Sequence, residues 1–227
     1  MREEVIGDAR LSFRVGHISE AAELVVRWHY SKRAPANPQF VGTWHEAGGL
    51  FGDYGPAVAA CFLCIPPTRW GEDLLELGRL VRSPAVNTPL TGLISATCRR
   101  AGRNGADLIV SYADQTQRHH GGIYQAASWN YAGCREQVMD GLIVNGQFVP
   151  GRSCNSTWGT RSPAKLRTLF PDWGIEPHYD QGKHLYWKAI NRAGERKAAR
   201  LGLQKIHYPK PRLFAEPPKQ AVQDAMV

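Results

Sequence analysis

The residues best suited to chemistry lie in the stretch 108–133, LIVSYADQTQRHHGGIYQAASWNYAG. A carboxylate, Asp114, follows Ser111 and Tyr112, and a phenol, Tyr124, comes after two histidines and two glycines. A carboxylate can accept a proton and a phenol can donate one, so this set suits general acid–base catalysis. The alternative is structural: Asp114 would cap the helix that follows, and the aromatic side chains would pack in the core.

The element before Asp114 indicates why a site would form there. Residues 108–110 are a continuous apolar run, which predicts a strand buried on both faces in a sheet with parallel neighbours. Open α/β sheets bind ligands at the carboxyl ends of such strands. Gly121 and Gly122 open a helix predicted over residues 122–129, with Tyr124 in its first turn. We therefore expect Asp114 and Tyr124 at the mouth of one site.

Apolar periodicity and turn signals predict the remaining elements. Ser19 is expected to cap the first helix, and Thr88 with Pro89 to begin the second. The apolar face of the first helix carries Ala21, Leu24, Val25 and Trp28. Predicted strands are residues 11–18, 40–44, 57–65, 74–81, 108–110 and 184–189, and further helices are residues 163–170 and 192–203.

Two dipeptides, Asp140-Gly141 and Asn145-Gly146, are typical of hairpin turns. From Tyr208 on, frequent prolines predict an extended tail. We therefore expect a catalytic domain over residues 1–190 and a basic helix with a Pro-rich tail over residues 191–227.

Composition narrows the class of protein. The chain has 227 residues, of which 43% are hydrophobic, and no apolar run approaches the roughly 20 residues of a membrane span. The charged start, MREEVIGDAR, lacks the apolar region of a signal peptide, so a cytosolic location is expected. Cys61 and Cys64 lie in a predicted strand, where residues three apart face opposite sides. This spacing therefore argues against a zinc site.

The net charge of +8 is unevenly distributed. Residues 1–160 contain 15 Lys and Arg against 14 Asp and Glu, whereas residues 161–227 contain 13 against 6. A basic segment beside a nearly neutral domain suggests a polyanionic partner such as nucleic acid. A solvated basic tail without such a role is the alternative.

The order of elements resembles the GNAT acyltransferases, which have a central mixed sheet flanked by helices, an α+β or α/β fold. In that family the pantetheine arm of an acyl-CoA pairs with the fourth strand, and its pyrophosphate lies at the N-terminus of the next helix, where free N–H groups favour an anion. The corresponding segments here are residues 77–82 and 87–92. The resemblance implies an acyl-CoA-type donor. The cofactor-binding residues that it implies are Arg79, Leu80, Val81, Thr88 and Thr91.

In detail the chain is similar to the phage Mom-like DNA-modification proteins, from about residue 24 to 210. The residues that carry this resemblance are Trp28-His29-Tyr30, Glu76-Leu77-x-Arg79-Leu80, Ser111-Tyr112-Ala113-Asp114, Gly122-Ile123-Tyr124-Gln125-Ala126, Trp129, Gly133, Gly159-Thr160-Arg161-Ser162, Lys183-His184-x-Tyr186 and Tyr208-Pro209-Lys210. That family adds a carbamoylmethyl group to adenine N6 in phage DNA, which blocks host restriction. The resemblance implies double-stranded DNA as substrate, in the cytoplasm of a bacterial host. A homodimer is left open.

The resemblance also implies roles for residues. The target adenine would leave the duplex and stack on aromatic side chains, for which Tyr112, Trp129 and Tyr131 are candidates with core packing as the alternative. Asp114 would accept the N6 proton and Tyr124 would act as the acid, with Ser111 and Tyr112 completing the catalytic set. Arg79 would bind a phosphate, orient Asp114 or form a structural salt bridge. The expected DNA contacts are Lys165, Arg167, Lys188, Arg196, Lys197 and Arg200.

The product chemistry adds a further hypothesis. Acyl transfer from a thioester gives an amide, whereas the family's product has an N–CH2 link, so another donor or a second chemistry is needed. His29 and Tyr30, with Asp114, are ligand types that suit iron, which suggests a metal site at His29 and Tyr30. A hydrogen-bonded helix end is the structural alternative for this pair. Two other functions stay open: a GNAT-like N-acyltransferase acting on a small amine or protein, and a non-catalytic DNA-binding protein.

Overall fold

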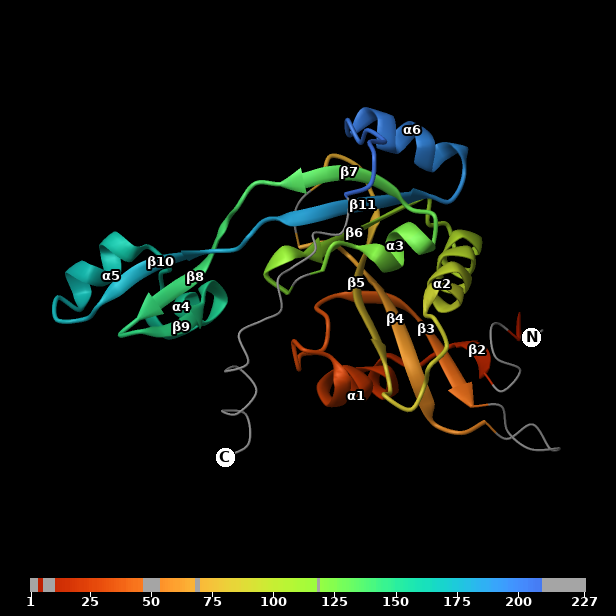
Figure 1. The fold of residues 1–227 in the computed structure, drawn as a ribbon, viewed down its shortest axis with the longest axis horizontal. Helices are drawn as coiled ribbons and strands as arrows, with labels where there is room; N and C mark the ends of the chain where they lie inside the picture. The colour runs from red at the N-terminus through yellow and green to blue at the C-terminus, as the bar shows by residue number, and fades with distance from the viewer. Residues whose placement is uncertain (1–3, 6–10, 47–53, 68–69, 118, 210–227) are drawn as a thin grey trace.

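A central mixed sheet organises the molecule (Figure 1), as predicted. The computed structural model describes residues 4–5, 11–46, 54–67, 70–117 and 119–209. Eight strands are arranged in the order β1-β2-β3-β4-β5-β6-β11-β7, and β5 and β6 are its parallel pair. The strands of this sheet are β1 (Glu4–Val5), β2 (Leu11–Val15), β3 (Pro38–Glu46), β4 (Ala57–Cys64), β5 (Leu75–Arg82), β6 (Leu108–Asp114), β7 (Asn130–Arg135) and β11 (Lys183–Ala189).

Helices cover both faces of this sheet. On one face, α1 (Ile18–Trp28) packs on β4 and β5, and α6 (Arg192–Arg200) packs on β6 and β11. On the other face lie α2 (Thr91–Arg103) and the short α3 (Gly122–Ala126). Strand alternation places Cys61 in the core under α2 and Cys64 in the core under α1. The prediction that these two thiols face opposite sides is therefore confirmed.

The sheet opens between β5 and β6. These strands pair only at Leu75 with Ile109 and at Glu76 with Val110, and they separate beyond this point. A β-bulge lies at the same place, because Leu77 and Arg79 of β5 oppose consecutive residues of β4 and leave Gly78 as the extra residue. The carboxyl-terminal half of β6 therefore has β11 on one side and no strand on the other.

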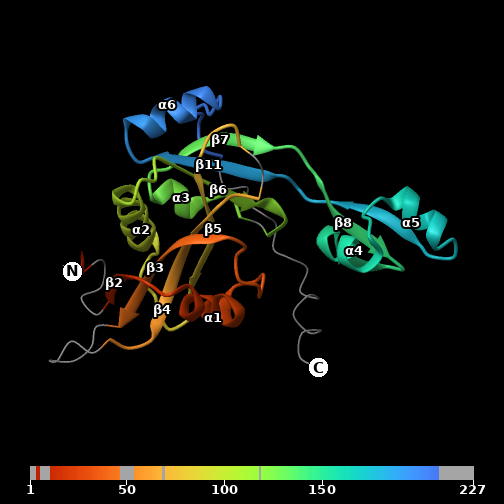
Figure 2. The ribbon, with the colours of Figure 1, turned by 180° about the vertical axis from the view of Figure 1, so that it is seen from behind.

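A second, smaller unit extends from one end of the sheet in both views (Figure 2). This small lobe, residues 139–179, has a sheet in the order β10-β8-β9 and two helices. Its elements are β8 (Met139–Val144), β9 (Gln147–Pro150), α4 (Gly151–Trp158), α5 (Pro163–Leu169) and β10 (Ile175–Tyr179). It has its own apolar core, which includes Leu142, Leu166 and Ile175. Asn145 and Gly146, both with positive φ, form the predicted hairpin turn between β8 and β9.

Several predicted details are wrong. The first strand ends at Val15, and the first helix begins after His17 rather than at a Ser19 cap. Trp28 is 44% exposed instead of lying on the buried face, because the helix ends there at the rim of the sheet. The second helix is capped by Leu90, so Thr88 and Pro89 precede it.

The remaining corrections concern the second half of the chain. The dipeptide Asp140-Gly141 lies inside β8 instead of forming a turn. The strand at 108–110 is buried on both faces, but only one of its neighbours is parallel. The domain division at residue 190 remains a prediction, and residues 210–227 of the predicted tail lie outside the described residues. None of the helices in the described part of the chain has the length and apolar character that a membrane crossing needs.

Candidate functional site

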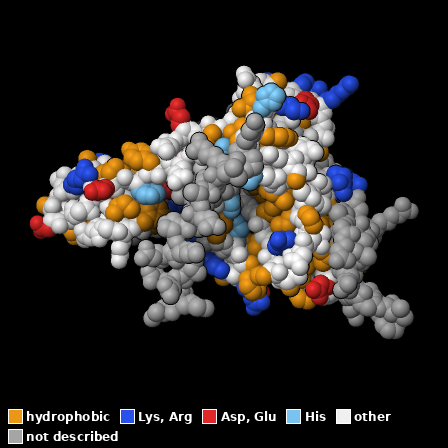
Figure 3. Space-filling view, in the orientation of Figure 1, with side chains coloured by type: hydrophobic (Ala, Val, Ile, Leu, Met, Phe, Trp, Pro, Cys, Tyr) orange, Lys and Arg blue, Asp and Glu red, His pale blue; other side chains and the backbone are white. Residues whose placement is uncertain are grey.

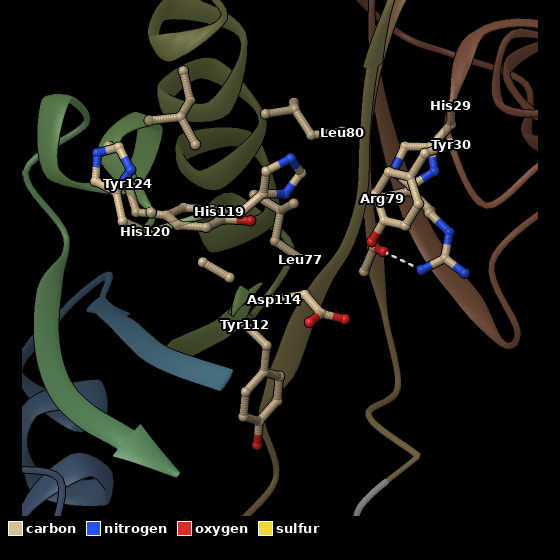
Figure 4. Close-up of a pocket in the computed structure, with 15 residues that line it drawn as sticks. His29, Tyr30, Leu77, Arg79, Leu80, Tyr112, Asp114, His119, His120 and Tyr124 are labelled. Carbon is tan, nitrogen blue, oxygen red and sulfur yellow. Dashed lines mark hydrogen bonds between the residues drawn. The ribbon is translucent and has the colours of Figure 1, made fainter. Parts of the chain in front are cut away.

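The gap between β5 and β6 holds a cavity of about 410 Å³, called here the β5–β6 hollow (Figure 4). Four segments line it: the end of α1, the bulged part of β5, the end of β6 and the glycine-rich turn into α3. Seven of the predicted site residues meet in this cavity: His29, Tyr30, Arg79, Leu80, Tyr112, Asp114 and Tyr124. Asp114 and Tyr124 therefore border one cavity, whereas their role in a catalytic site stays a prediction.

Tyr124 is anchored by Ser111. The Ser111 Oγ lies 2.9 Å from the Leu77 carbonyl oxygen and 2.8 Å from the Tyr124 hydroxyl. A serine has one hydroxyl hydrogen and a carbonyl can only accept, so Ser111 donates to Leu77 and accepts from Tyr124. Burial raises the pKa of Tyr124 well above its usual range. The phenol therefore stays protonated at neutral pH, which makes it a hydrogen-bond donor rather than a nucleophile.

Ser111 itself is fully buried and does not line the hollow, so it positions Tyr124 and does not contact a ligand. Gly121 holds the turn before α3 in a left-handed conformation, with φ +79°. A Cβ on Gly121 would lie 2.2 Å from Cε2 of Tyr186, and the Tyr186 hydroxyl donates to the His120 carbonyl. Only glycine therefore allows this turn to bring Tyr124 against β6.

Asp114 borders the hollow from one face of β6, whereas Ser111 and Tyr124 lie on the other face. Its Oδ1 accepts a hydrogen bond of 2.9 Å from the backbone N–H of Thr116, so it stabilises the turn after β6. Asp114 was predicted, as an alternative, to cap the helix that follows, but it stabilises the turn directly after β6 instead. The Asp114 carboxylate also approaches Tyr30, and burial together with this negative charge raises the pKa of Tyr30. Asp114 and Tyr124 make no direct hydrogen bond within the described residues.

His29 and Tyr30 form the outer wall, with ring centroids 4.3 Å apart. The Nδ1 of His29 accepts a hydrogen bond of 3.1 Å from the backbone N–H of Ser31, so in the neutral ring the proton is on Nε2. Burial, followed by the charge of Arg79, lowers the pKa of His29 to about 4. His29 is therefore uncharged at neutral pH, and its backbone N–H closes α1 by donating to Val25.

This hydrogen bonding does not suit the metal hypothesis. A metal ligand needs a free nitrogen lone pair, whereas Nδ1 of His29 already accepts and Nε2 carries the proton. In the part of the chain that the structure describes, no three His, Cys, Asp or Glu side chains group closely enough to hold a metal ion. The hypothesis of an iron site at His29 and Tyr30 is not supported, and the alternative of a hydrogen-bonded helix end holds.

Arg79 lies beside Tyr30 and donates to two backbone carbonyls, at 2.6 Å to Gly78 and 3.4 Å to Arg33 (Figure 4). It forms no salt bridge among the described residues, so neither the structural ion pair nor an orienting contact to Asp114 is present. Its charge stays available to a ligand in the hollow.

Other predicted residues are not brought to this cavity. Trp129 and Tyr131 are 0% and 6% exposed in the core under α2, which excludes them as stacking platforms and confirms core packing. Tyr112, by contrast, does line the hollow; its side chain is half-buried, and its ring contacts the guanidinium of Arg135. The remaining predicted cofactor-binding residues, Val81, Thr88 and Thr91, do not line the hollow, and Val81 is buried under α1.

Most of the predicted DNA contacts are occupied within the protein. Lys197 pairs with Asp107 at 2.9 Å, Arg200 pairs with Glu72, and Arg167 donates twice to the Ile175 carbonyl. Lys188 donates to the carbonyls of Ala127 and Ser128. Lys165 lies on α5 and Arg196 on α6, at opposite ends of the molecule (Figure 1). Figure 3 likewise shows Lys and Arg side chains at several separate places on this face rather than in one patch.

Sequence reasoning gave no role to Glu76. This side chain lies in β5 next to Arg79, and burial raises its pKa above the usual range for a carboxyl. Its Oε2 is buried and has no hydrogen-bond partner in the described structure. A glutamate between two leucines of a strand is itself a signal, because charged residues are rarely buried without a partner.

Comparison with known proteins identifies the family. The sequence profile of the Mom protein family matches residues 11–210. The chain belongs to this family. No curated protein matched the sequence. The fold is GNAT-like, with the order of strands and helices that the sequence predicted.

Solved structures that match this Mom family protein are GNAT enzymes at low identity. YhbS from Escherichia coli in complex with CoA is 12% identical, with 57% of this chain and 72% of that chain covered and a TM-score of 0.39. An acetyltransferase from Bacillus subtilis in complex with CoA is 12% identical, with coverage of 80% and 99% and a TM-score of 0.43. The yncA protein from Salmonella typhimurium, with acetyl-CoA, is 11% identical, with coverage of 81% and 95% and a TM-score of 0.46.

Proposed function

We propose that this protein transfers a carbamoylmethyl group to the N6 amine of adenine in DNA and so protects phage DNA from restriction. Membership of the Mom family suggests the reaction. The observation that carries the proposal for this chain is the hollow where β5 and β6 separate, which Asp114 and Tyr124 border from opposite faces of β6. A ligand that fills the gap can contact both groups at once.

The hollow has features that suit a purine. The base must leave the duplex, because N6 is not reachable for this chemistry inside the stack. Tyr30 is 55% exposed at the rim, with its ring tilted by 31° against His29 and at an edge-on angle to His119, so its exposed part offers a surface for an extruded base. Neutral His29 adds no positive charge, which favours an uncharged heterocycle there. Tyr30 takes the place that Trp129 and Tyr131, both buried, cannot fill.

In the proposed step, adenine N6 forms a bond to the methylene carbon of a donor that carries the carbamoylmethyl group on a leaving group. The bond between this carbon and the leaving group breaks, and the leaving group departs with the electron pair. Asp114 accepts the proton that N6 loses. Tyr124 stays protonated, and in this step its hydroxyl hydrogen would turn from Ser111 to the departing atom, while Ser111 keeps its bond to Leu77. We place the arm of a coenzyme-A-type carrier, joined to the methylene carbon through the leaving sulfur and not through a thioester, along the unpaired edge of β5, where it can hydrogen-bond to free backbone groups.

The test is expression in a bacterium, followed by digestion of its DNA to nucleosides and mass spectrometry of deoxyadenosine. A mass increase equal to a carbamoylmethyl group is expected. Asp114→Asn is the decisive variant, because asparagine retains the Oδ1 that accepts from Thr116 and removes only the charge and basicity. Loss of modification with unchanged thermal stability would support the role of a base. Full modification by this variant would show that Asp114 only stabilises the turn after β6 and is not the base.

The runner-up function is N-acylation of a small amine or protein by an acyl-CoA. The open edge of β5 favours it, since that edge suits a pantetheine arm whatever the acceptor is. Unmodified adenine combined with tight binding of acetyl-CoA and no binding of DNA would favour this function over the proposal. DNA binding without any modified nucleoside would favour a non-catalytic DNA-binding protein.

A further inference from the structure

A second cavity, of about 540 Å³, lies where the small lobe meets the central sheet. We call it the lobe hollow. It shares Tyr30, Arg79, Tyr112 and Asp114 with the β5–β6 hollow, so the two cavities adjoin. A long ligand with one part in the first cavity would therefore pass through the second.

Two arginines of the small lobe border the lobe hollow and have no internal partner. Arg152 lies in the first turn of α4, and Arg161 follows that helix. Both are exposed, and neither forms a hydrogen bond or ion pair within the described residues. They lie close together, because the Cδ of Arg161 is 3.5 Å from a Cβ built on Gly151, the neighbour of Arg152. Two unpaired guanidinium groups that border one cavity suit an anion.

The acids of this cavity do not neutralise that pair. Asp180 is 4% exposed and accepts from the backbone N–H groups of Val138 and Gly182, and its other oxygen is 3.5 Å from Lys183 Nζ. Asp140 is hydrogen-bonded at 2.7 Å to His178. Glu76, Asp114 and Glu136 complete the acidic lining. Glu76 and Asp114 belong to β5 and β6, and Glu136 precedes the lobe. The lobe itself lines the cavity with Arg152 and Arg161 against the single acid Asp140, so its side carries a net positive charge.

We infer that the lobe hollow is the phosphate-binding site of the DNA strand that contributes the extruded adenine, with Arg152 and Arg161 as its main contacts. This inference rests on the proposed function. The cations assigned to DNA from sequence are largely held in internal contacts, whereas these two are free and border a cavity that leads to Asp114. Arg135 and Lys183 extend the same wall toward the central sheet.

The test compares two double variants with equal loss of charge. Arg152→Ala with Arg161→Ala removes the lobe pair, and Arg192→Ala with Arg196→Ala removes two exposed arginines of α6, one of which sequence analysis assigned to DNA. Affinity for a short adenine-containing duplex is measured over a range of salt concentrations by fluorescence anisotropy. Affinity for coenzyme A is measured in parallel, because its phosphates are the other source of the same chemistry.

Each phosphate contact contributes about 0.9 to the slope of log K against log salt, so the lobe variant is expected to lower that slope by about 1.8. At 0.1 M salt this corresponds to a loss of roughly 60-fold in duplex affinity. The α6 variant should bind like the parent, and coenzyme A affinity should not change. Equal losses in both variants, or a loss for coenzyme A instead of the duplex, would overturn the inference.

Nucleoside analysis of host DNA separates this inference from the proposed function. Duplex binding that needs Arg152 and Arg161, without any modified adenine from the parent protein, would refute the function and retain the phosphate site. Modified adenine made equally by the parent and the lobe variant, with unchanged duplex affinity, would refute the phosphate site and retain the function.

Discussion

Replacing Ser111 with alanine tests how the site is held together. Ser111 links the Leu77 carbonyl in β5 to the Tyr124 hydroxyl in α3, next to the place where β5 and β6 separate. Alanine leaves both partners without their hydrogen bond. Tyr124→Phe, by contrast, removes only the outer donor, and Ser111 keeps its bond to Leu77.

The magnitudes follow from burial. An unsatisfied buried polar group costs about 1–3 kcal/mol, so Ser111→Ala should destabilise by roughly 2 kcal/mol, mainly through the Leu77 carbonyl. Tyr124→Phe loses one hydrogen bond between neutral groups and should cost about 1 kcal/mol. Because the bond between Ser111 and Tyr124 is lost in either variant, the double variant should cost about 1 kcal/mol less than the sum of the two. In a chain of this length Ser111→Ala should lower Tm by about 4–8 °C.

Urea unfolding of the parent, the two single variants and the double variant measures this cycle. Ser12→Ala is the matched control, because the Ser12 Oγ is buried without a partner in the described structure and its removal should cost little. Additive effects, within about 0.5 kcal/mol, would show that Ser111 and Tyr124 are not coupled. A larger loss for Tyr124→Phe than for Ser111→Ala would contradict the assigned direction of the hydrogen bonds.

Three further predictions concern the same region. Gly121→Ala should cost about 2–4 kcal/mol in urea unfolding, because a left-handed conformation and a clash with Tyr186 act together, whereas Gly146→Ala, with similar φ and open space, should cost only about 1 kcal/mol. His29 has a pKa near 4 in the folded protein against 6.5 in the unfolded chain, so the unfolded chain binds its proton first as pH falls. The free energy of unfolding should therefore decrease as pH drops from 6.5 to 4, and His29→Gln should weaken that decrease. An equal decrease in the parent and the variant would refute the shift. Burial raises the pKa of Glu76, so the charged carboxylate disfavours folding as pH rises above 4.5. Glu76→Gln should therefore be more stable than the parent at pH 7 but not at pH 4. Equal stability of the two proteins at pH 7 would contradict this prediction.

Sequence predicted those elements whose own pattern is strong. The continuous apolar run at 108–110 is buried on both sides, and the helix predicted over residues 163–170 is α5, which begins at Pro163. The Asn145-Gly146 turn is where the pattern placed it, because few other residues accept two successive positive φ values. In each case the local signal and the fold agree.

The sequence could not predict where the sheet opens, because the opening depends on how β5 pairs with β4 and with β6. A bulge at Gly78 and the early end of the pairing of β5 with β6 leave no mark in the periodicity of either strand. Burial likewise separates residues that look alike in sequence. Tyr30 at the end of α1 is exposed at the rim, whereas Trp129 and Tyr131 are inside the core, and only the packing of α3 against β11 decides this.

The cations illustrate the same limit. The sequence places most of the excess charge after residue 160, and the structure shows that proximity to acids decides which of those charges remain available. Lys197 and Arg200 secure α6 against Asp107 and Glu72, whereas Arg161 has no such neighbour. Net charge alone therefore does not identify which cations are available to a partner.

The gap between β5 and β6 also explains why a carboxylate on one face of β6 and a phenol packed against the other face can border one cavity. In a closed sheet, a neighbouring strand would separate the two faces, and Asp114 and Tyr124 would lie in different environments. Here the edge of β6 is bare beyond Val110, so both side chains border the same cavity and no protein group connects them directly. A substrate in the gap would complete the contact between base and acid. The site is thus formed by the absence of strand pairing at one place, and a substitution that restored pairing there would abolish it without altering either residue.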